Sequence, residues 1–104
     1  MKHLIGFLRN MKIKFSDKSY LALDEIADFI YKETKSKKFT SKYIRSIRIY
    51  IKNTLIDFPK LGRPAEEFGD NIRKLVYQKY SILYRIQEDN IEILTLYREN
   101  LPKL

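Results

Sequence analysis

The sequence predicts an α+β protein of two layers, in which a helical hairpin packs on a mainly antiparallel four-stranded sheet. Three observations lead to this fold class. Apolar residues recur at helical spacing in two successive segments in the first half of the chain. Three segments rich in β-branched and aromatic residues follow in the second half and are joined by short turns. A short alternating segment precedes the helices, so the expected element order is βααβββ.

The first expected elements are a strand over Lys12–Phe15 and a helix over Asp17–Glu33. The strand alternates basic with apolar residues, and Ser16 and Asp17 are residue types that begin helices. Within the helical segment, apolar side chains recur at spacings of three and four, while acidic side chains gather on a different face. We therefore expect an amphipathic helix with an acidic outer face.

The second expected helix begins at Ser36 or Phe39, ends at Asp57 and is basic on its polar side. The turn before it, Thr34–Lys38, is so short that the two helices must form an antiparallel hairpin. Pro59 ends the hairpin, because proline cannot continue a helix and favours extended geometry in the residue before it. The apolar stripe comprises Phe39, Tyr43, Ile44, Ile47, Tyr50, Ile51 and Leu55. The basic residues of the opposite face, within an arc of roughly 120°, are Lys38, Lys42, Arg45, Arg48 and Lys52.

The second half of the chain begins with an irregular segment over Phe58–Asp70, which contains prolines and glycines. Strands are then expected over Ile72–Gln78, Tyr80–Gln87 and Ile91–Tyr97, and their short connections predict an antiparallel meander. The hairpin covers one face of the resulting sheet. The other face also carries large apolar side chains, so it must be partly open or covered by something else.

Composition indicates a basic, single-domain protein and excludes several chemistries. The chain has 104 residues, with 21 Lys plus Arg against 13 Asp plus Glu, which gives a formal net charge of +8. With no Cys and one His, it has no disulfide framework, thiolate metal site, Cys nucleophile or His-based triad. No phosphate-binding glycine motif, metalloprotease motif or serine-hydrolase motif occurs. We therefore expect neither a metal nor a cofactor.

Residues 1–10 are interpreted as a short N-terminal extension, and residues 11–104 as a single domain. The apolar run in MKHLIGFLRN is shorter than that of a signal peptide and no small-residue cleavage site follows, while Met11 offers a second plausible start. No apolar run reaches the roughly 18 residues of a membrane span. With no Cys and no signal peptide, the cytoplasm is the expected compartment, and no membrane partner is expected.

Four sequence segments in fixed order carry a resemblance to a known family. They are FPKLGRP at residues 58–64, IRKLV at 72–76, YSILYRI at 80–86 and IEILTLYR at 91–98. Together with the βααβββ order, they resemble the RelE/ParE family of bacterial toxins over nearly the whole chain. The resemblance implies the toxin of a type II toxin–antitoxin system, a small basic cytoplasmic protein. It also implies a cognate acidic antitoxin that wraps round the toxin, blocks it and alone contacts operator DNA.

The family has two branches of different activity, and residues 58–64 and 80–86 are similar to the ParE branch. Toxins of the RelE branch cleave mRNA in the ribosome with basic residues on the sheet, whereas ParE-type toxins are not nucleases and poison DNA gyrase. Ser81 stands where the RelE branch typically has an Arg, and seven residues after Tyr97 leave little room for that branch's C-terminal helix. Lys74 and Arg98 nevertheless fall near basic positions of the RelE branch.

The expected function is therefore inhibition of growth by binding and poisoning of DNA gyrase, neutralised by an antitoxin, with no catalysis by the toxin. The alternative is a metal-independent, ribosome-dependent mRNA endoribonuclease. A third hypothesis is a degenerate relative that only binds an antitoxin or assembles with it.

The candidate catalytic residues, which apply only to a nuclease, are Arg73, Lys74, Tyr97 and Arg98. Cleavage of RNA without a metal or a His needs a base for the 2′-hydroxyl, positive charge on the phosphorane and an acid for the leaving oxygen. Lys and Arg supply the charge, and Tyr rings stack on bases. The alternative role of these side chains is cross-strand packing, with Arg stems lying over Tyr rings.

The candidate binding residues are basic and lie in the second helix, the loop and the meander. The basic helix face is either a solvated surface, a surface that attracts nucleic acid or ribonucleoprotein, or a docking surface for an acidic antitoxin. Arg63 either meets a target or ties the loop to Asp57, Glu66, Glu67 or Asp70, and Arg85 either binds or packs. The full set is Lys38, Lys42, Arg45, Arg48, Lys52, Arg63 and Arg85.

Overall fold

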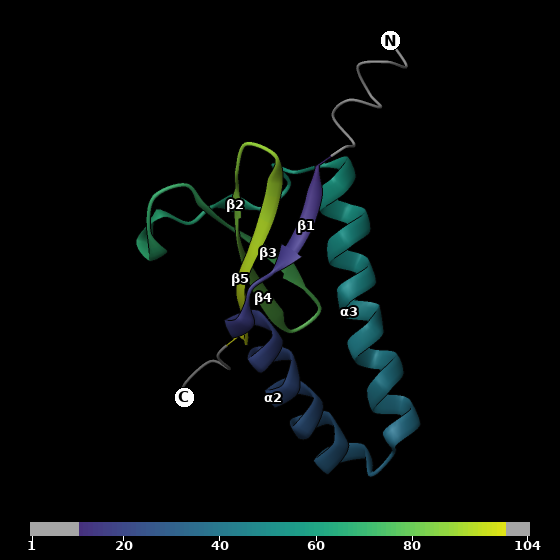
Figure 1. Ribbon diagram of the computed structural model, residues 1–104. Coiled ribbons are helices and arrows are strands. Elements are labelled where there is room, and N and C mark those ends of the chain that lie inside the picture. Colours follow the sequence, from purple (N-terminus) through teal and green to yellow (C-terminus); the bar gives the residue numbers. More distant parts are fainter. Residues whose placement is uncertain (1–10, 100–104) are drawn as a thin grey trace.

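The computed structural model describes residues 11–99 and shows the expected α+β fold, with five strands rather than four. The expected extension over residues 1–10 and the last five residues, 100–104, lie outside the described residues. Two helices pack against a mostly antiparallel sheet (Figure 1) whose strand order is β1-β5-β4-β3-β2. The two-layer architecture predicted from the sequence is therefore confirmed.

The helical hairpin consists of α2 (Asp17–Thr34) and α3 (Lys37–Asp57). Its bounds agree with the predicted ones to within one residue, taking Ser36 as the predicted start of the second helix. The periodicity identified the buried side correctly, because Ile47 and Ile51 of α3 are fully buried. Within residues 11–99, neither helix is long and apolar enough to span a membrane.

A serine caps the start of each helix, as the sequence predicts for α2. The Ser16 Oγ accepts a hydrogen bond from the Ser19 N–H, and the Ser36 Oγ accepts one from the Phe39 N–H, both at 3.0 Å. Lys35 takes a left-handed conformation with φ of 57°, which ends α2. Two residues between the helices are therefore enough to reverse the chain.

The four predicted strands are β1 (Lys12–Phe15), β3 (Ile72–Tyr77), β4 (Tyr80–Ile86) and β5 (Asn90–Arg98). The last three form the antiparallel meander that their short connections indicate. The first strand pairs in parallel with β5, so the chain crosses from one edge of the sheet through the hairpin to the other side.

The prediction of four strands was wrong by one edge strand, β2 (Arg63–Pro64). These two residues pair antiparallel with Lys74 and Arg73 of β3. Two residues cannot display strand alternation, and a Pro two residues after a Gly is typical of a loop. The edge position of β2 accommodates Pro64, since a Pro has no N–H to donate to a further ladder.

The main core lies between the hairpin and the sheet. Its largest fully buried side chain is Tyr84 of β4. The buried members are Ala22, Leu23, Ile26, Ile47, Ile51, Leu55, Leu75, Tyr80, Ile82, Tyr84, Ile91, Ile93 and Leu96.

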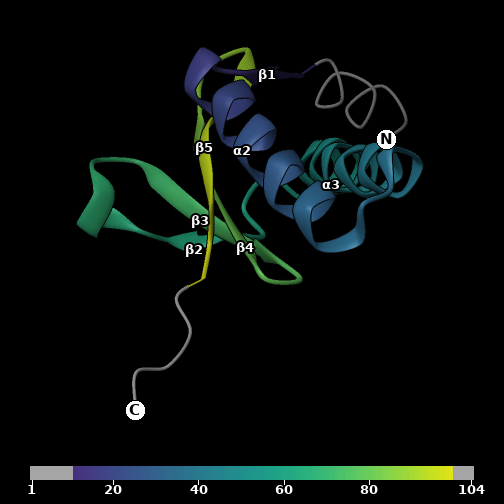
Figure 2. The same cartoon turned by 90° about the horizontal axis from the view of Figure 1, so that it is seen from below.

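The other face of the sheet carries a second, smaller apolar cluster of Ala65, Ile72 and Leu83, with Leu94 and Tyr97 packed against it. The loop after α3 carries a 3-10 turn, η1 (Glu66–Phe68), on this side of the sheet. Figure 2 shows the hairpin on one side of the sheet and the loop with η1 on the other. The second face is therefore partly covered by the chain itself and otherwise open, and we call it the open face.

A bulge in β5 decides which of its side chains reach the open face. The pairing of β4 with β5 shifts between Leu83, which lies opposite Thr95, and Tyr84, which lies opposite Ile93. Leu94 is left without a partner, so the alternation is reset along the strand. As a result, Tyr97 lies on the open face and Arg98 lies on the hairpin side.

Candidate functional site

The structure separates the four candidate catalytic residues onto two faces of the sheet. Lys74 and Tyr97 lie on the open face, where the Lys74 Nζ is 5.8 Å from the centroid of the Tyr97 ring. Arg73 and Arg98 lie on the hairpin side, one near each end of the sheet, since Arg73 is paired with Tyr84 and Arg98 with Tyr80. The four side chains therefore do not converge on one reacting group.

Arg73 holds the loop after α3 rather than pointing into solvent. Its Nε donates to the carbonyl oxygen of Gly62 at 2.7 Å and its Nη2 to that of Lys60 at 3.2 Å. The buried Tyr84 hydroxyl donates to the Pro59 carbonyl at 2.7 Å and accepts from the Gly62 N–H at 2.9 Å. Arg73 and Tyr84 together fix residues 59–62 against the sheet.

Arg98 borders an apolar cavity between α2 and the end of β5. Its guanidinium carbon lies 4.7 Å from the centroid of the Phe29 ring, a cation–π arrangement. The cavity has a volume of about 300 Å³. It is lined by Ala22, Glu25, Ile26, Phe29, Tyr80, Leu96, Tyr97 and Arg98.

Lys74 is paired with a carboxylate that was not among the predicted site residues. Its Nζ lies 2.8 Å from the Glu99 Oε1, and the Ser81 hydroxyl donates to the same oxygen. The hydrogen bond that Lys74 donates to Glu99 raises the pKa of Lys74, although burial acts in the opposite direction. Lys74 is therefore held as an ammonium ion and is unsuited to act as a general base.

The other two basic candidates of the sheet and loop are also placed near carboxylates. Arg63 forms an ion pair with Glu67 at 3.2 Å and donates to the Pro64 carbonyl at 2.8 Å. This is one of the structural ties considered from the sequence. Arg85 lies directly opposite Glu92 in the β4–β5 ladder.

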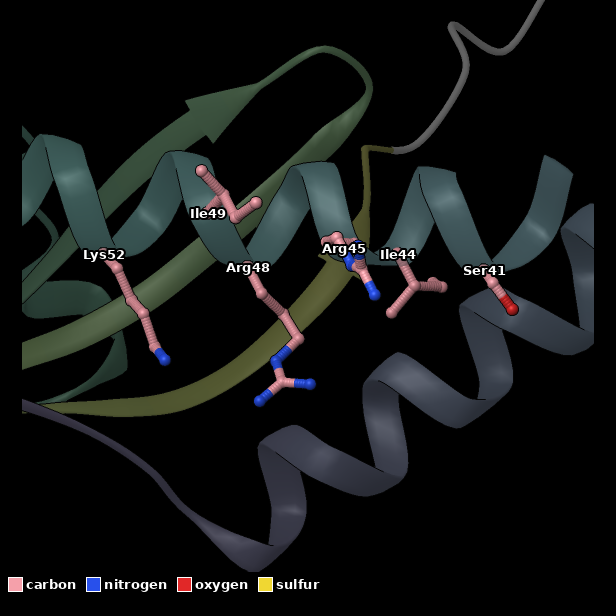
Figure 3. Close-up of a pocket in the computed structure, with 6 residues that line it drawn as sticks. All are labelled: Ser41, Ile44, Arg45, Arg48, Ile49 and Lys52. Carbon is pink, nitrogen blue, oxygen red and sulfur yellow. The ribbon is translucent and has the colours of Figure 1, made fainter. Parts of the chain in front are cut away.

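The basic face of α3 borders a crevice beside the hairpin, shown in Figure 3. The crevice has a volume of about 480 Å³ and its lining holds three cationic side chains and no acidic one. Figure 3 shows Arg48 and Lys52 pointing away from α3 in the same direction. The lining residues are Ser41, Ile44, Arg45, Arg48, Ile49 and Lys52. The remaining two basic candidates of this face, Lys38 and Lys42, are exposed outside the crevice.

Arg48 differs from its neighbours because it is packed against aromatic rings. Its guanidinium carbon lies 5.7 Å from the centroid of the Phe15 ring and 5.9 Å from that of Tyr20. Its Nε is buried and has no hydrogen-bond partner among the described residues. Arg48 is thus a partly desolvated cation held in place by rings, which favours charge-assisted hydrogen bonds with an incoming anion.

Sequence reasoning missed Glu99 and treated Ser81 only as a departure from the RelE pattern. Glu99 follows β5 and lies beyond the last strand predicted from the sequence, Ile91–Tyr97. Its N–H donates to the Lys79 carbonyl at 2.8 Å, so the ladder continues to this residue. The available signal was the alternation itself, which places residue 99 on the same face as residue 97.

No group of three or more His, Cys, Asp or Glu residues that could hold a metal occurs within residues 11–99. The described side chains of α3 offer positive charge, and those of the open face offer rings beside cations that are paired with carboxylates. This chemistry suits recognition of anions and of apolar surfaces.

Comparison with known proteins finds a family and a solved structure that are similar to this chain. Residues 13–100 match the family described as the ParE toxin of the type II toxin–antitoxin system, parDE. The fold is similar to a solved chain of the chromosomal ParDE toxin–antitoxin system from P. aeruginosa, with a TM-score of 0.73 and 21% sequence identity. This similarity covers 88% of the present chain and 99% of that chain. No curated protein sequence matches the present chain.

Proposed function

This chain belongs to the ParE family of toxins from type II toxin–antitoxin systems, and we propose that it inhibits growth by binding and poisoning DNA gyrase. In this proposal the toxin performs no covalent chemistry of its own. It acts in the cytoplasm, where gyrase is found, and needs no metal or cofactor.

One observation favours a function in binding over a function in catalysis. The four residues proposed for a nuclease are divided between the two faces of the sheet, with Lys74 and Tyr97 on one and Arg73 and Arg98 on the other. General acid–base cleavage needs its groups within hydrogen-bond reach of one substrate. Arg73 is also engaged by two loop carbonyls. This geometry gives little support to the alternative of a ribosome-dependent endoribonuclease.

We propose that the basic face of α3 contributes the main electrostatic contact with the target. Segment 35–52 holds seven basic residues and no acidic one, and the ion pairs found within residues 11–99, Lys74–Glu99 and Arg63–Glu67, do not involve this face. Unpaired cations create a positive field that speeds association with an acidic partner surface. Arg48 and the exposed apolar Ile49 add local contacts inside the crevice.

We propose that a cognate acidic antitoxin neutralises the toxin by covering exposed apolar and basic surface. The cavity between α2 and β5 suits such a partner through its apolar walls, including the 42% exposed Phe29, and through the Arg98 cation, which shares the lining with one carboxylate, Glu25. An acidic amphipathic segment would satisfy both features. Contact with operator DNA is assigned to the antitoxin and not to this chain.

Two assays in parallel test the proposed target. The purified chain is added to gyrase with supercoiled plasmid, and separately to a cell-free translation reaction with a reporter mRNA. We expect loss of gyrase activity with accumulation of cleaved plasmid, and no cleavage of mRNA. In cells, thymidine incorporation is expected to stop before methionine incorporation. Cleavage of mRNA with unaffected gyrase would overturn the proposal in favour of the nuclease.

A further inference from the structure

The open face of the sheet carries the components of a nucleic-acid site, but its central cation is neutralised. Lys74 on β3 lies beside the Tyr97 ring on β5, and the Phe68 ring of η1 lies 6.1 Å from that of Tyr97. Arg63 lies opposite Lys74 in the neighbouring strand. Lysines and arginines that neutralise phosphates, next to rings that stack on bases, are what single-stranded nucleic acid requires.

Glu99 is placed against Lys74 by several contacts rather than by chance proximity on a surface. Its N–H is bonded to the Lys79 carbonyl, which extends the β4–β5 ladder by one step. The fully buried Ser81 then donates its hydroxyl to the Glu99 Oε1. Lys74 contacts the same oxygen at 2.8 Å, and its side chain is only 14% exposed. A hydroxyl and an ammonium thus meet at one anionic oxygen.

This oxygen occupies the position that a phosphate oxygen would take. A phosphodiester oxygen accepts the same two hydrogen bonds and carries the same charge, so it would compete with the Glu99 carboxylate for Lys74 and Ser81. The carboxylate is part of the chain and is held in place already, whereas a nucleic acid must lose entropy to bind. A bound phosphate would in addition be repelled by the carboxylate.

We propose that Glu99 is a specificity-determining residue, which prevents the open face from binding nucleic acid by filling the anion position between Lys74 and Ser81. The chain's affinity for polyanions is then confined to the α3 side of the molecule. This inference goes beyond the proposed function, and its test does not depend on whether gyrase is the target.

The test compares binding of a short fluorescein-labelled single-stranded RNA by the purified full-length chain and its Glu99→Gln variant. Fluorescence anisotropy is measured over a series of salt concentrations. Glutamine keeps the shape and can still accept a hydrogen bond, so only the charge is lost. We expect several-fold tighter binding at low salt. We also expect the slope of log K against log salt to steepen by about 0.7, the value for one added phosphate contact on a single strand.

Two further variants separate the proposed local effect from a general increase in positive charge. Asp28→Asn makes the same change in net charge at an exposed position of α2, in the layer that covers the opposite face of the sheet. It is expected to change the salt slope much less than Glu99→Gln. Adding Lys74→Met to Glu99→Gln is expected to abolish the gain. Circular dichroism and thermal unfolding establish that each variant is folded.

Equal effects of Glu99→Gln and Asp28→Asn would overturn the inference, because net charge alone would then explain the binding. A gain that survives Lys74→Met would overturn it as well. If Glu99→Gln does not fold, Glu99→Ala serves as a second variant. It removes the carboxylate and leaves both Lys74 and Ser81 available as donors, and it is expected to give a gain in the same direction.

Discussion

At the scale of single residues, the side chains of Tyr84 and Arg73 hold the loop after α3 against the sheet. Tyr84 is fully buried, and its hydroxyl joins the Pro59 carbonyl to the Gly62 N–H. Burial, the largest influence, raises the pKa of Tyr84, so the hydroxyl stays protonated and can donate. A Cβ on Gly62 would lie 2.7 Å from this ring and 2.8 Å from the Lys74 carbonyl. The glycine is therefore needed for close approach of the loop to the sheet.

Tyr84→Phe is expected to destabilise the protein by about 2 kcal/mol, because it leaves a buried N–H and a carbonyl without their partner. Urea denaturation followed by circular dichroism measures the change in the free energy of unfolding. Tyr31→Phe is the matched control, since the Tyr31 side chain is 41% exposed and no hydrogen bond of its hydroxyl is found within residues 11–99. Similar losses in the two variants would contradict the role assigned to the Tyr84 hydroxyl.

The Lys74–Glu99 pair gives stability a dependence on pH. The hydrogen bond from Lys74, followed by that from Ser81, lowers the pKa of Glu99 in the folded state. A carboxyl with a lowered folded pKa stabilises the fold above its unfolded pKa, and this contribution is lost as the pH falls through the folded pKa. The pKa of Lys74 is raised in the folded state, so the stability that this residue contributes is lost only at alkaline pH, as the pH rises through its folded pKa.

The difference in the free energy of unfolding between wild type and Glu99→Gln is therefore expected to be constant around neutral pH. It should shrink as the pH falls below the ordinary glutamate pKa of about 4.3. Urea denaturation at a series of acidic pH values measures this difference. A difference that persists unchanged at the acidic end would show that the charge of Glu99 is not responsible.

At the scale of elements, the two helix starts use the same cap residue in different surroundings. Ser36 caps α3 at an exposed site through one hydrogen bond, from Phe39. Ser16 caps α2 and also donates its hydroxyl to the carbonyl of Leu94 at 2.8 Å. Leu94 is the unpaired residue of the bulge in β5. Ser16 thus joins the start of α2 to the irregular point of the sheet.

Ser16→Ala is expected to cost about 2 kcal/mol and Ser36→Ala about 0.5 kcal/mol, the two ends of the range for loss of a serine cap. The larger value at Ser16 includes the cost of leaving the Leu94 carbonyl without its hydrogen-bond donor. Chemical denaturation of both variants measures the two values under the same conditions. Equal costs would mean that the contact with the bulge contributes nothing.

At the scale of the whole molecule, charge is distributed unevenly between the two faces. The ion pairs found within residues 11–99 lie on the open face and its loop, at Lys74–Glu99 and Arg63–Glu67. The basic residues of α3 take part in neither of these ion pairs, so positive charge is concentrated on the α3 side, whereas α2 has more acidic than basic residues. Association through this side should weaken strongly as salt is raised.

The double variant Arg45→Glu/Lys52→Glu is expected to reduce inhibition of gyrase by roughly tenfold, because reversed charge removes electrostatic attraction to the target. The control Lys32→Glu/Lys79→Glu makes the same change in net charge at exposed positions outside the crevice. Plasmid supercoiling at increasing toxin concentration measures the inhibition. An equal loss in both double variants would indicate that net charge, and not the α3 face, governs the interaction.

The sequence by itself determined the elements, the fold class and the family, because periodicity, caps and turn residues act over a few neighbouring positions. The predicted bounds of the helices and of the four longer strands differ from the observed ones by at most one residue, with Ser36 taken as the start of the second helix. Tertiary structure alone decided the edge strand Arg63–Pro64, the bulge at Leu94 and the partners of Lys74 and Arg73. These features depend on contacts between residues far apart in the chain. The bulge also changes the face of the sheet on which every later side chain of β5 lies. From the sequence, the basic candidates could be named but not assigned to different roles. The tertiary structure assigns Arg73 to holding the loop, pairs Lys74 and Arg63 with carboxylates, and leaves the basic face of α3 outside these ion pairs.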